Sequence, residues 1–486
     1  MSKLDRRTAF MIGTAGVAVS QLSSAQSPEP KIELPSAGKL RSRSCASIPA
    51  SPLSVGFETL DRQMFQPEKT YGPLARLGVK WARVQTGWAR TERQRGEYDF
   101  TWLDQVVDSL LKIGIQPWFN LGYGNRLYTP GAPHETAVGF VPMNSPEARA
   151  AWLAYVGRLA ERFRGRVRHW EIWNEPNGKG FWRPHDPDPR AYAELVGMTA
   201  PVIRKQIPDA VIVGFALAGL GSGLDFVKGA LDSGIAPHLD KVSFHPYRLV
   251  PEANYADEVR SLRRLLAKYK PGIEIWQGEN GAPSKIGGAG HVFEVDGTEA
   301  GQAKWLLRRI LTDLSLDVEL TSYFHTVDLA NYIWSGGPSG QTQRMGLLRE
   351  DYTPKMSYAA YQSLCALFDA KSKRADLTAM FRKPSPPGEK GRPALVEGIW
   401  RAAFLRDNRP IYAYWWPGDL SQPARREEVE VSLWPDAELT APVLIDPLTA
   451  QVYSPRSARK GGHTELTRLP LLDYPLIITD RSAIPG

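Results

Sequence analysis

The sequence predicts an α/β fold, in which a (β/α)8 barrel of the triosephosphate isomerase (TIM) type is followed by a β-sandwich. Two observations support this prediction. Between about residues 50 and 370, short apolar runs alternate with amphipathic helical patterns, as parallel strands joined by helical crossovers require. After about residue 372, runs of β-forming residues between Pro, Gly and Asp turns replace the long helical patterns.

Eight short apolar runs are the expected barrel strands. Helix starts lie between them: Thr101 precedes Asp104 by three residues, and Ser145 and Asp188 each precede a proline. The structural alternative is an open doubly wound sheet, but no Gly-rich phosphate fingerprint follows the first strand. The predicted strands are 55–60, 81–86, 115–121, 169–174, 211–217, 241–245, 274–278 and 321–327.

Four segments are therefore expected along the chain. Arg6 and Arg7 precede a mildly apolar stretch and a site of small residues ending at Ala25, a pattern that resembles a twin-arginine export signal. Such a signal predicts a periplasmic or secreted protein. The segments are a signal at 1–25, a linker or surface arm at 26–48, the barrel at 49–371, and a β-sandwich at 372–486. The role of this sandwich stays open between bracing the barrel, which is favoured, and binding sugar.

Composition limits the expected partners. No apolar run reaches the roughly 18 residues of a membrane span, so no membrane insertion is expected. The formal charge is +8, but Lys and Arg are scattered on predicted helix faces such as 158–164 and 263–270, which argues against a nucleic-acid partner. Cys45 and Cys365 are too few for a disulfide framework; their pairing and the oligomeric state stay open.

Two glutamates occupy matching positions in the predicted barrel. Glu175 follows the fourth strand within an aromatic segment, and Glu279 ends the seventh. Reactive groups of such barrels lie where strands end and loops begin, and strand alternation places Glu171, Trp173 and Glu175 on one face. Cleavage of a glycosidic bond uses two carboxyl groups, separated by about 5 to 5.5 Å for retention or about 6.5 to 9.5 Å for inversion.

The segment Trp170-Glu-Ile-Trp-Asn-Glu-Pro-Asn177, together with the Glu279 segment, resembles the retaining glycoside hydrolases of clan A. It is most similar to family 39, a group with β-xylosidases and related enzymes, and the resemblance covers about residues 50 to 370. It implies that Glu175 is the general acid/base and Glu279 the nucleophile. It also implies that Asn174 hydrogen-bonds the 2-hydroxyl of the sugar.

Three further residues match the same family pattern. Arg83 corresponds to a second-strand arginine that keeps the nucleophile ionised, although a buried arginine bracing Glu171 is the alternative. In Ser243-Phe-His-Pro-Tyr247, the resemblance implies that His245 lines the sugar site and that Tyr247 donates a hydrogen bond to the nucleophile.

Aromatic side chains at predicted rim positions are candidates for stacking on sugar rings. Trp118, Trp182 and Trp334 are selected, and Trp182, in the loop after Glu175, is the first candidate for a substrate platform. Many clan members end the eighth strand with a tryptophan in the sugar site, whereas residues 322–328 contain none. Phe324, His325 or Trp334 are the candidates to replace it.

Other functional classes fit less well. None of the eight histidines forms an HxH or HExxH pair, so neither a metal nor another cofactor is expected. Residues 219–223 lack the GxSxG spacing of a serine hydrolase. The expected partner is a β-linked oligo- or polysaccharide, and the retained alternative is a carbohydrate-binding barrel without turnover. Sugar identity, linkage and exo or endo cleavage stay open.

Overall fold

The computed structural model describes residues 31–334, 337–384, 393–434 and 439–485. The chain divides into Met1–Glu33 and one compact unit, Leu34–Gly486. The predicted export signal at 1–25 lies outside the described residues. Within the described residues, every helix is too short or too polar to cross a membrane.

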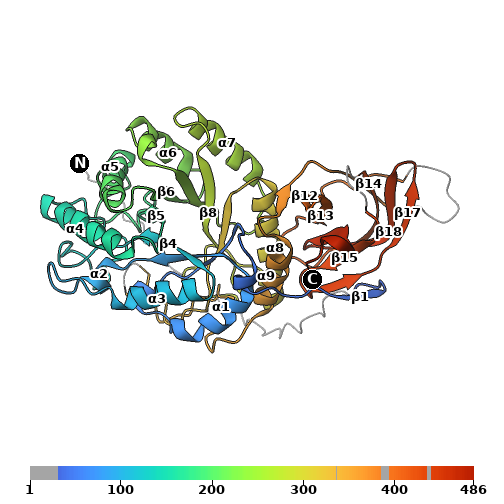
Figure 1. Cartoon of the computed structure of the whole chain (residues 1–486), viewed down its shortest axis with the longest axis horizontal. Helices are drawn as coiled ribbons and strands as arrows, with labels where there is room; N and C mark the ends of the chain where they lie inside the picture. Colours follow the sequence, from blue (N-terminus) through green and yellow to red (C-terminus); the bar gives the residue numbers. More distant parts are fainter. Residues whose placement is uncertain (1–30, 335–336, 385–392, 435–438, 486) are drawn as a thin grey trace, which may run out of the picture. The chain divides into compact units, whose positions relative to one another are not determined.

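Eight parallel strands close into a barrel in chain order, which confirms the predicted TIM-barrel fold (Figure 1). Every predicted strand is present. The first begins and ends earlier than expected, and the last is shorter, because residues 324–327 turn into a loop. The strands are β2 (Leu53–Gly56), β3 (Trp81–Gln85), β4 (Gln116–Leu121), β5 (His169–Ile172), β6 (Val211–Ala218), β7 (Lys241–His245), β8 (Glu274–Asn280) and β9 (Leu320–Tyr323).

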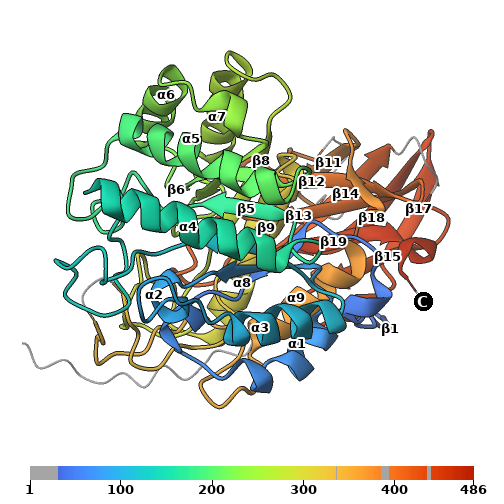
Figure 2. The ribbon, with the colours of Figure 1, turned by 60° about the vertical axis from the view of Figure 1, so that its left-hand side comes forward.

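Helices surround these strands (Figure 2). The predicted caps at Ser145 and Asp188 are present, since their side chains accept hydrogen bonds from the backbone N–H groups of Ala148 and Arg190. The expected cap at Thr101 is wrong, because Thr101 is already helical and Asp99 accepts its N–H. The α-helices are α1 (Tyr71–Leu77), α2 (Trp88–Thr91), α3 (Thr101–Lys112), α4 (Pro146–Phe163), α5 (Pro189–Gln206), α6 (Gly223–Asp232), α7 (Tyr255–Ala267), α8 (Glu299–Ser315) and α9 (Met356–Leu367), and the 3-10 helices are η1 (Cys45–Ser47), η2 (Leu60–Arg62), η3 (Pro67–Lys69), η4 (Ala236–His238) and η5 (Arg481–Ala483).

Two antiparallel sheets follow the barrel, as predicted for a C-terminal β domain. One has the order β1-β16-β15-β19-β13-β12-β10, and the other has the order β11-β14-β18-β17. Strand β1 comes from the segment expected to be a linker or surface arm, a pairing with β16 that the sequence did not predict. The strands are β1 (Ser36–Lys39), β10 (Ser372–Arg374), β11 (Thr378–Arg382), β12 (Trp400–Arg406), β13 (Arg409–Trp415), β14 (Glu427–Trp434), β15 (Pro442–Asp446), β16 (Gln451–Tyr453), β17 (Arg456–Lys460), β18 (His463–Leu471) and β19 (Leu476–Asp480).

A buried polar cluster joins the β domain to α8. Arg308 donates to both oxygens of Glu252, at 2.9 and 2.5 Å, and to the carbonyl of Gly418 at 2.6 Å. Trp415 of β13 donates its indole N–H to the same Glu252 carboxylate at 2.6 Å. Since these groups are buried, their mutual hydrogen bonds offset the loss of water.

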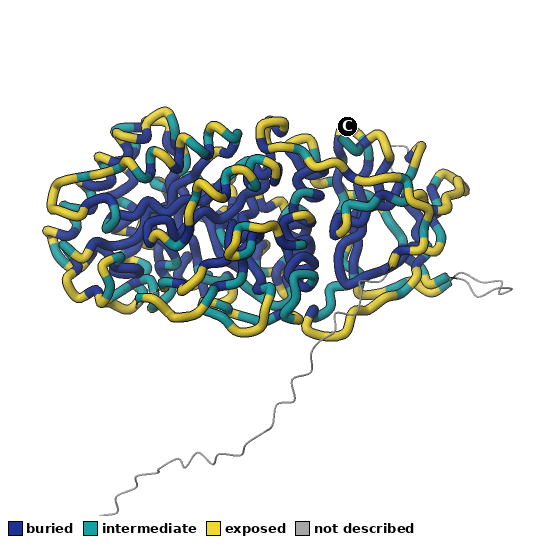
Figure 3. Tube along the Cα trace, turned by 90° about the horizontal axis from the view of Figure 1, so that it is seen from below, coloured by how far each residue is buried: buried dark blue, intermediate teal, exposed yellow. Residues whose placement is uncertain are grey.

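Aromatic residues fill the barrel interior near the strand starts. Trp118 and Trp276 pack edge to face with ring centroids 5.2 Å apart, and Val213 and Leu320 complete a buried cluster beside Trp81. Figure 3 shows buried segments running through the interior of the molecule and exposed segments along its outside. The two cysteines, Cys45 and Cys365, are both buried and free.

Candidate active site

The chain changes direction directly before Glu175. Strand β5 ends at Ile172, and both Trp173 and Glu175 adopt left-handed backbone conformations, with φ of 69° and 46°. The expected alternation therefore stops at the strand end. The prediction that Trp173 shares a face with Glu175 is wrong, because the Trp173 ring packs against Trp152 of α4, with centroids 6.0 Å apart. Glu175 instead turns back toward the centre of the barrel rim.

A register shift in β8 places Glu279. The residue of this strand that packs into the barrel interior is Trp276, so regular alternation would direct Glu279 outward. The pairing with β9 shifts between Gln277 and Asn280, and this irregularity turns the Glu279 side chain inward. Gly278, the residue before it, lies close to the same network, since a Cβ atom there would be 3.4 Å from the Glu171 carboxylate and from the His245 ring.

Glu175 and Glu279 face each other across the rim. One oxygen of each carboxylate and a ring nitrogen of His245 all lie within 4.8 Å of one another. Their spacing is close to the roughly 5 to 5.5 Å of retaining glycosidases and leaves less room than the roughly 6.5 to 9.5 Å of inverting enzymes.

Arg83 connects Glu279 to a buried network. Its guanidinium donates to Glu279 at 2.7 Å, to Glu171 at 2.8 and 2.5 Å, and to Glu58 at 3.2 Å. Its fourth partner is the side-chain carbonyl of Asn174, at 2.8 Å. This contact leaves the Asn174 amide N–H groups free to donate toward the site. Both alternatives considered for Arg83 hold together, because it braces Glu171 and also contacts Glu279.

One arginine cannot balance three nearby carboxylates, and the structure indicates which of them is neutral. Burial raises the pKa of Glu58 to about 8, and although Arg83 opposes this, the charge of Glu279 adds to it. Glu58 is therefore protonated at neutral pH, which leaves the Arg83 charge to Glu279 and Glu171. Glu171 also accepts hydrogen bonds from Asn120, at 2.8 Å, and from the Ser243 hydroxyl.

Two residues, one ending β7 and one just beyond it, contact Glu175 and Glu279. The Tyr247 hydroxyl donates to Glu279 at 2.9 Å, and burial together with that carboxylate holds the tyrosine pKa well above its ordinary value. Nδ1 of His245 lies 2.8 Å from Glu175 and 3.8 Å from Glu279. Burial lowers the pKa of His245 to about 4, so the ring is neutral at physiological pH.

The two carboxylates consequently have unlike surroundings. Glu279 accepts hydrogen bonds from a guanidinium and a phenol. Burial raises the pKa of Glu175 to about 7, and the more distant Arg83 only partly opposes this. Glu175 can therefore hold a proton near neutral pH, whereas Glu279 lies against two hydrogen-bond donors, one of them a cation.

Two of the three selected tryptophans are not at the sugar-facing surface. Trp118 is fully buried below Arg83, whose guanidinium carbon lies 5.5 Å from the indole centroid. Trp182 is 1 % exposed, because its ring packs between Trp173 and Tyr192. Their predicted stacking role is corrected to one in packing.

Trp334 does lie at the rim. It is 49 % exposed and packs beside Phe181 of the loop after Glu175, with ring centroids 6.1 Å apart. Phe181 in turn stacks on Tyr123, at 5.7 Å. The other candidates for the missing strand-end tryptophan are turned inward: Phe324 is buried, and His325 lies 3.1 Å from the backbone oxygen of Glu58.

Sequence reasoning missed several site residues. Glu58, Asn120 and Tyr123 follow or end the first and third barrel strands, so the signal that found Glu175, a polar or aromatic group at a strand end, was available for them. Tyr332 lies in a long loop without such a signal, yet the charges of Glu279, Glu58 and Glu175 add to the effect of burial in raising its pKa.

Glu175, His245 and Glu279 also have the spacing of a metal site. The hydrogen bonds from Arg83 and Tyr247 already occupy both oxygens of Glu279, and the guanidinium charge opposes a second cation there. The arrangement thus fits proton transfer and nucleophilic attack better than metal binding.

A sequence model of glycosyl hydrolases family 39 matches residues 77–256, which include β3 to β7 and Glu175. The β-xylosidase of Geobacillus stearothermophilus is 28 % identical over 198 residues, which are 35 % of this chain and 38 % of that protein. Beta-glucosidase 1B of Phanerodontia chrysosporium is 31 % identical over 124 residues, or 23 % of this chain and 22 % of that protein. The matched segments span less than two thirds of either relative.

Solved structures show the same fold over most of the chain. A family 39 glycoside hydrolase from Bacteroides cellulosilyticus superposes with a TM-score of 0.65 at 19 % identity, over 89 % of this chain and 81 % of that one. A monomeric β-xylosidase from Caulobacter crescentus gives 0.60 at 18 % identity, over 92 % and 97 %. The expected resemblance to family 39 is confirmed.

Proposed function

We propose that this chain, a family 39-like glycoside hydrolase, is a retaining enzyme that cleaves the O-glycosidic bonds of a β-linked oligo- or polysaccharide. The observation that carries this proposal is the pair Glu175 and Glu279, closely spaced and in opposite electrostatic surroundings. Short spacing favours direct attack by one carboxylate, and the raised pKa of the other provides the proton.

In the first step, a Glu279 oxygen attacks the anomeric carbon and the bond from that carbon to the leaving oxygen breaks. The Glu175 proton passes to the leaving oxygen, so the leaving group departs as an alcohol. Asn174, held by Arg83, donates its amide N–H to the 2-hydroxyl of the sugar. This hydrogen bond strengthens as positive charge develops on the ring.

In the second step, water attacks the same carbon and the ester bond to Glu279 breaks. Glu175, now ionised, takes a proton from that water, and the Glu279 carboxylate is regenerated. In the covalent intermediate Glu279 carries no charge, and the loss of this nearby negative charge lowers the pKa of Glu175. Glu175 therefore acts as the acid in the first step and as the base in the second.

The substrate proposal follows the relatives. Two of the similar proteins are β-xylosidases and one is a β-glucosidase, so β-xylosides and β-glucosides are the first substrates to test. Trp334 and Phe181 offer aromatic faces beside the acid/base loop, where a leaving-group sugar can stack.

The test uses aryl β-xylosides and β-glucosides with wild type, Glu175→Ala and Glu279→Ala. We expect each variant to lose at least about 10³-fold in kcat/KM. Azide should partly restore Glu175→Ala on a good leaving group and give a β-azide, because a small anion can enter without base assistance. Wild-type activity in Glu279→Ala would disprove the nucleophile, and an inverted anomer in the NMR spectrum would disprove retention.

Export through the twin-arginine route is a separate proposal that rests on Arg6, Arg7 and the segment up to Ala25. Replacing both arginines with lysine should retain the protein in the cytoplasm of an expressing bacterium. Cell fractionation measures this, and unchanged export of that variant would contradict the proposal.

A further inference from the structure

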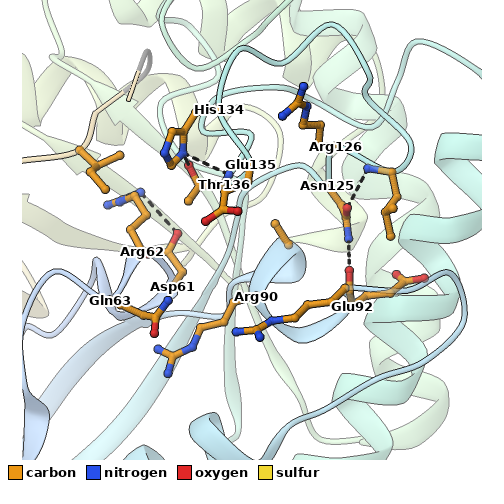
Figure 4. A pocket seen from close by; sticks show the side chains of 14 residues that line it. Asp61, Arg62, Gln63, Arg90, Glu92, Asn125, Arg126, His134, Glu135 and Thr136 are labelled. Atoms are coloured by element: carbon orange, nitrogen blue, oxygen red, sulfur yellow. Dashed lines mark hydrogen bonds and ion pairs between the residues drawn. The ribbon is translucent and has the colours of Figure 1, made fainter. Parts of the chain in front are cut away.

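A cavity of about 730 Å³ opens at the end of the barrel where Glu175 and Glu279 lie (Figure 4). It lies among the loops that follow β2, β3 and β4, and neither catalytic glutamate lines it. Arginines from all three loops line this cavity, namely Arg62, Arg90, Arg93 and Arg126.

Two tyrosines connect the cavity to the catalytic site. The guanidinium carbon of Arg62 lies 5.5 Å from the ring centroid of Tyr123. The Tyr123 ring also contacts the segment that carries Glu175, because it packs 5.8 Å from the Trp173 ring and stacks at 5.7 Å on Phe181. Tyr332 directly precedes Ile333 of the cavity wall, and Trp334, which follows Ile333, packs beside Phe181 of the loop after Glu175. A sugar chain bound at the glutamates can therefore extend past these rings into the cavity.

The acidic residues of the cavity do not balance its arginines. Asp61 pairs with Arg62, at 3.4 Å. The Glu92 carboxylate is buried and already accepts hydrogen bonds from Trp88 at 2.6 Å, from Tyr128 at 2.6 Å and from a backbone N–H at 2.7 Å. Glu135, exposed on the wall, is the remaining acidic group.

The other arginines have few anionic contacts. Arg90 lies over the Trp102 ring, at 4.2 Å, and burial lowers its pKa, although the negative charges of Asp61 and Asp99 oppose this shift. Arg93 and Arg126 are exposed, and among the described residues neither forms an ion pair. Two guanidinium groups are thus available to a ligand, and their planar donors match a carboxylate or a sulfate.

We propose that this cavity binds an anionic substituent, a carboxylate or a sulfate ester, on a sugar residue next to the one that is cleaved. The inference rests on the proposed glycosidase function and narrows its substrate class to an acidic saccharide. Arg93 and Arg126 contact the anion directly, whereas Arg62 and Arg90 shape the wall.

The probes are three monosaccharides that differ only at carbon 6: methyl β-glucoside, methyl β-glucuronide and methyl β-glucoside 6-sulfate. Binding is titrated by NMR against wild type, against the double variant Arg93→Gln/Arg126→Gln, and against Arg164→Gln. Arg164 is an exposed arginine at the opposite end of the barrel and, within the described residues, also lacks an ion pair, so it is a matched control.

We expect wild type and Arg164→Gln to bind the glucuronide or the 6-sulfate about 10-fold more tightly than the glucoside at low salt, and less so as salt rises. The double variant should bind all three within about 2-fold. The preferred anion identifies the substituent as carboxylate or sulfate.

Equal binding of the three probes to wild type, or an anion preference that survives in the double variant, would overturn the inference. Because the readout is binding, it does not depend on turnover. An anion preference together with full activity of Glu279→Ala would remove the proposed mechanism and leave the anion site standing as a binding site.

Discussion

The two ends of the barrel interior are built from different kinds of side chain. Near the strand starts, Trp81, Trp118 and Trp276 fill the space with aromatic rings. Near the strand ends, a single buried arginine donates hydrogen bonds to three glutamate side chains and an amide. The boundary is the contact between the Arg83 guanidinium and the Trp118 ring.

The difference indicates a division of labour within one core. Close-packed aromatic rings stabilise the barrel by burial and leave little freedom to move. The polar layer costs desolvation energy and is compensated only by complete pairing, so it orients the catalytic groups at some expense of stability. Substitutions at the two ends should therefore separate stability from activity.

The largest effect is expected for Arg83→Met, because it leaves Glu171 and Glu279 buried without their counter-charge. We expect the free energy of unfolding to fall by about 3 to 5 kcal/mol and kcat/KM by at least about 10³-fold. Denaturant unfolding and kinetics on an aryl glycoside measure the two quantities. Arg83→Lys keeps the positive charge but lacks the forked geometry of the guanidinium. It should recover only part of the lost stability and part of the lost kcat/KM. Native stability in Arg83→Met would contradict the role given to this layer.

Trp118→Ala tests the aromatic end. Removing a fully buried indole should lower the free energy of unfolding by about 3 to 5 kcal/mol through lost packing and a residual cavity. Trp334→Ala, the same change at a half-exposed rim position, should alter stability by less than about 1 kcal/mol. If the two variants unfold at the same denaturant concentration, the assignment of Trp118 to the core is wrong.

Glu175→Gln should stabilise the protein while inactivating it. The pKa of Glu175 in the fold is about 7 against an ordinary 4.5, so the unfolded chain loses this proton first as pH rises. Wild type therefore loses stability between about pH 4.5 and pH 7, by up to about 3 kcal/mol, and the glutamine variant does not.

Melting temperatures of wild type and Glu175→Gln at about pH 5 and about pH 8 measure this difference, which should be greater at the higher pH. Glu428→Gln, at an exposed position of β14, is the matched control and should show no such trend. The wild-type kcat/KM should also fall above about pH 7, as the general acid loses its proton. An alkaline limb well above that pH would argue against Glu175 as the acid.

The smallest effect is expected for Glu58→Gln. Since burial keeps Glu58 protonated near neutral pH, a neutral amide replaces a neutral acid, and kcat/KM should stay within about 3-fold of wild type. Glu171→Gln removes a carboxylate with two Arg83 contacts and should cost much more. Similar losses in the two variants would show that Glu58 is ionised.

Much of the fold was predictable because its signals are local. Apolar runs of strand length, the Ser145 and Asp188 caps, and turn-rich β segments are short-range features of the chain. The same apolar runs also placed Glu175 and Glu279 at strand ends. The inward direction of these two side chains could not be predicted, because strand alternation fixes only which residues share a face. The left-handed turn at Trp173 directs Glu175, and the register shift beyond Gln277 directs Glu279.

The sequence by itself therefore determined the barrel, the carboxylate pair and the family resemblance, all of which depend on residue type and spacing along one strand or loop. Only the tertiary structure decided that Trp118 and Trp182 pack inside, that Arg83 connects Glu279 to Glu58 and Glu171, and that four arginines of three loops line one cavity. Those contacts join residues far apart in the chain. Burial and charge act through distance in space, which the order of residues does not record.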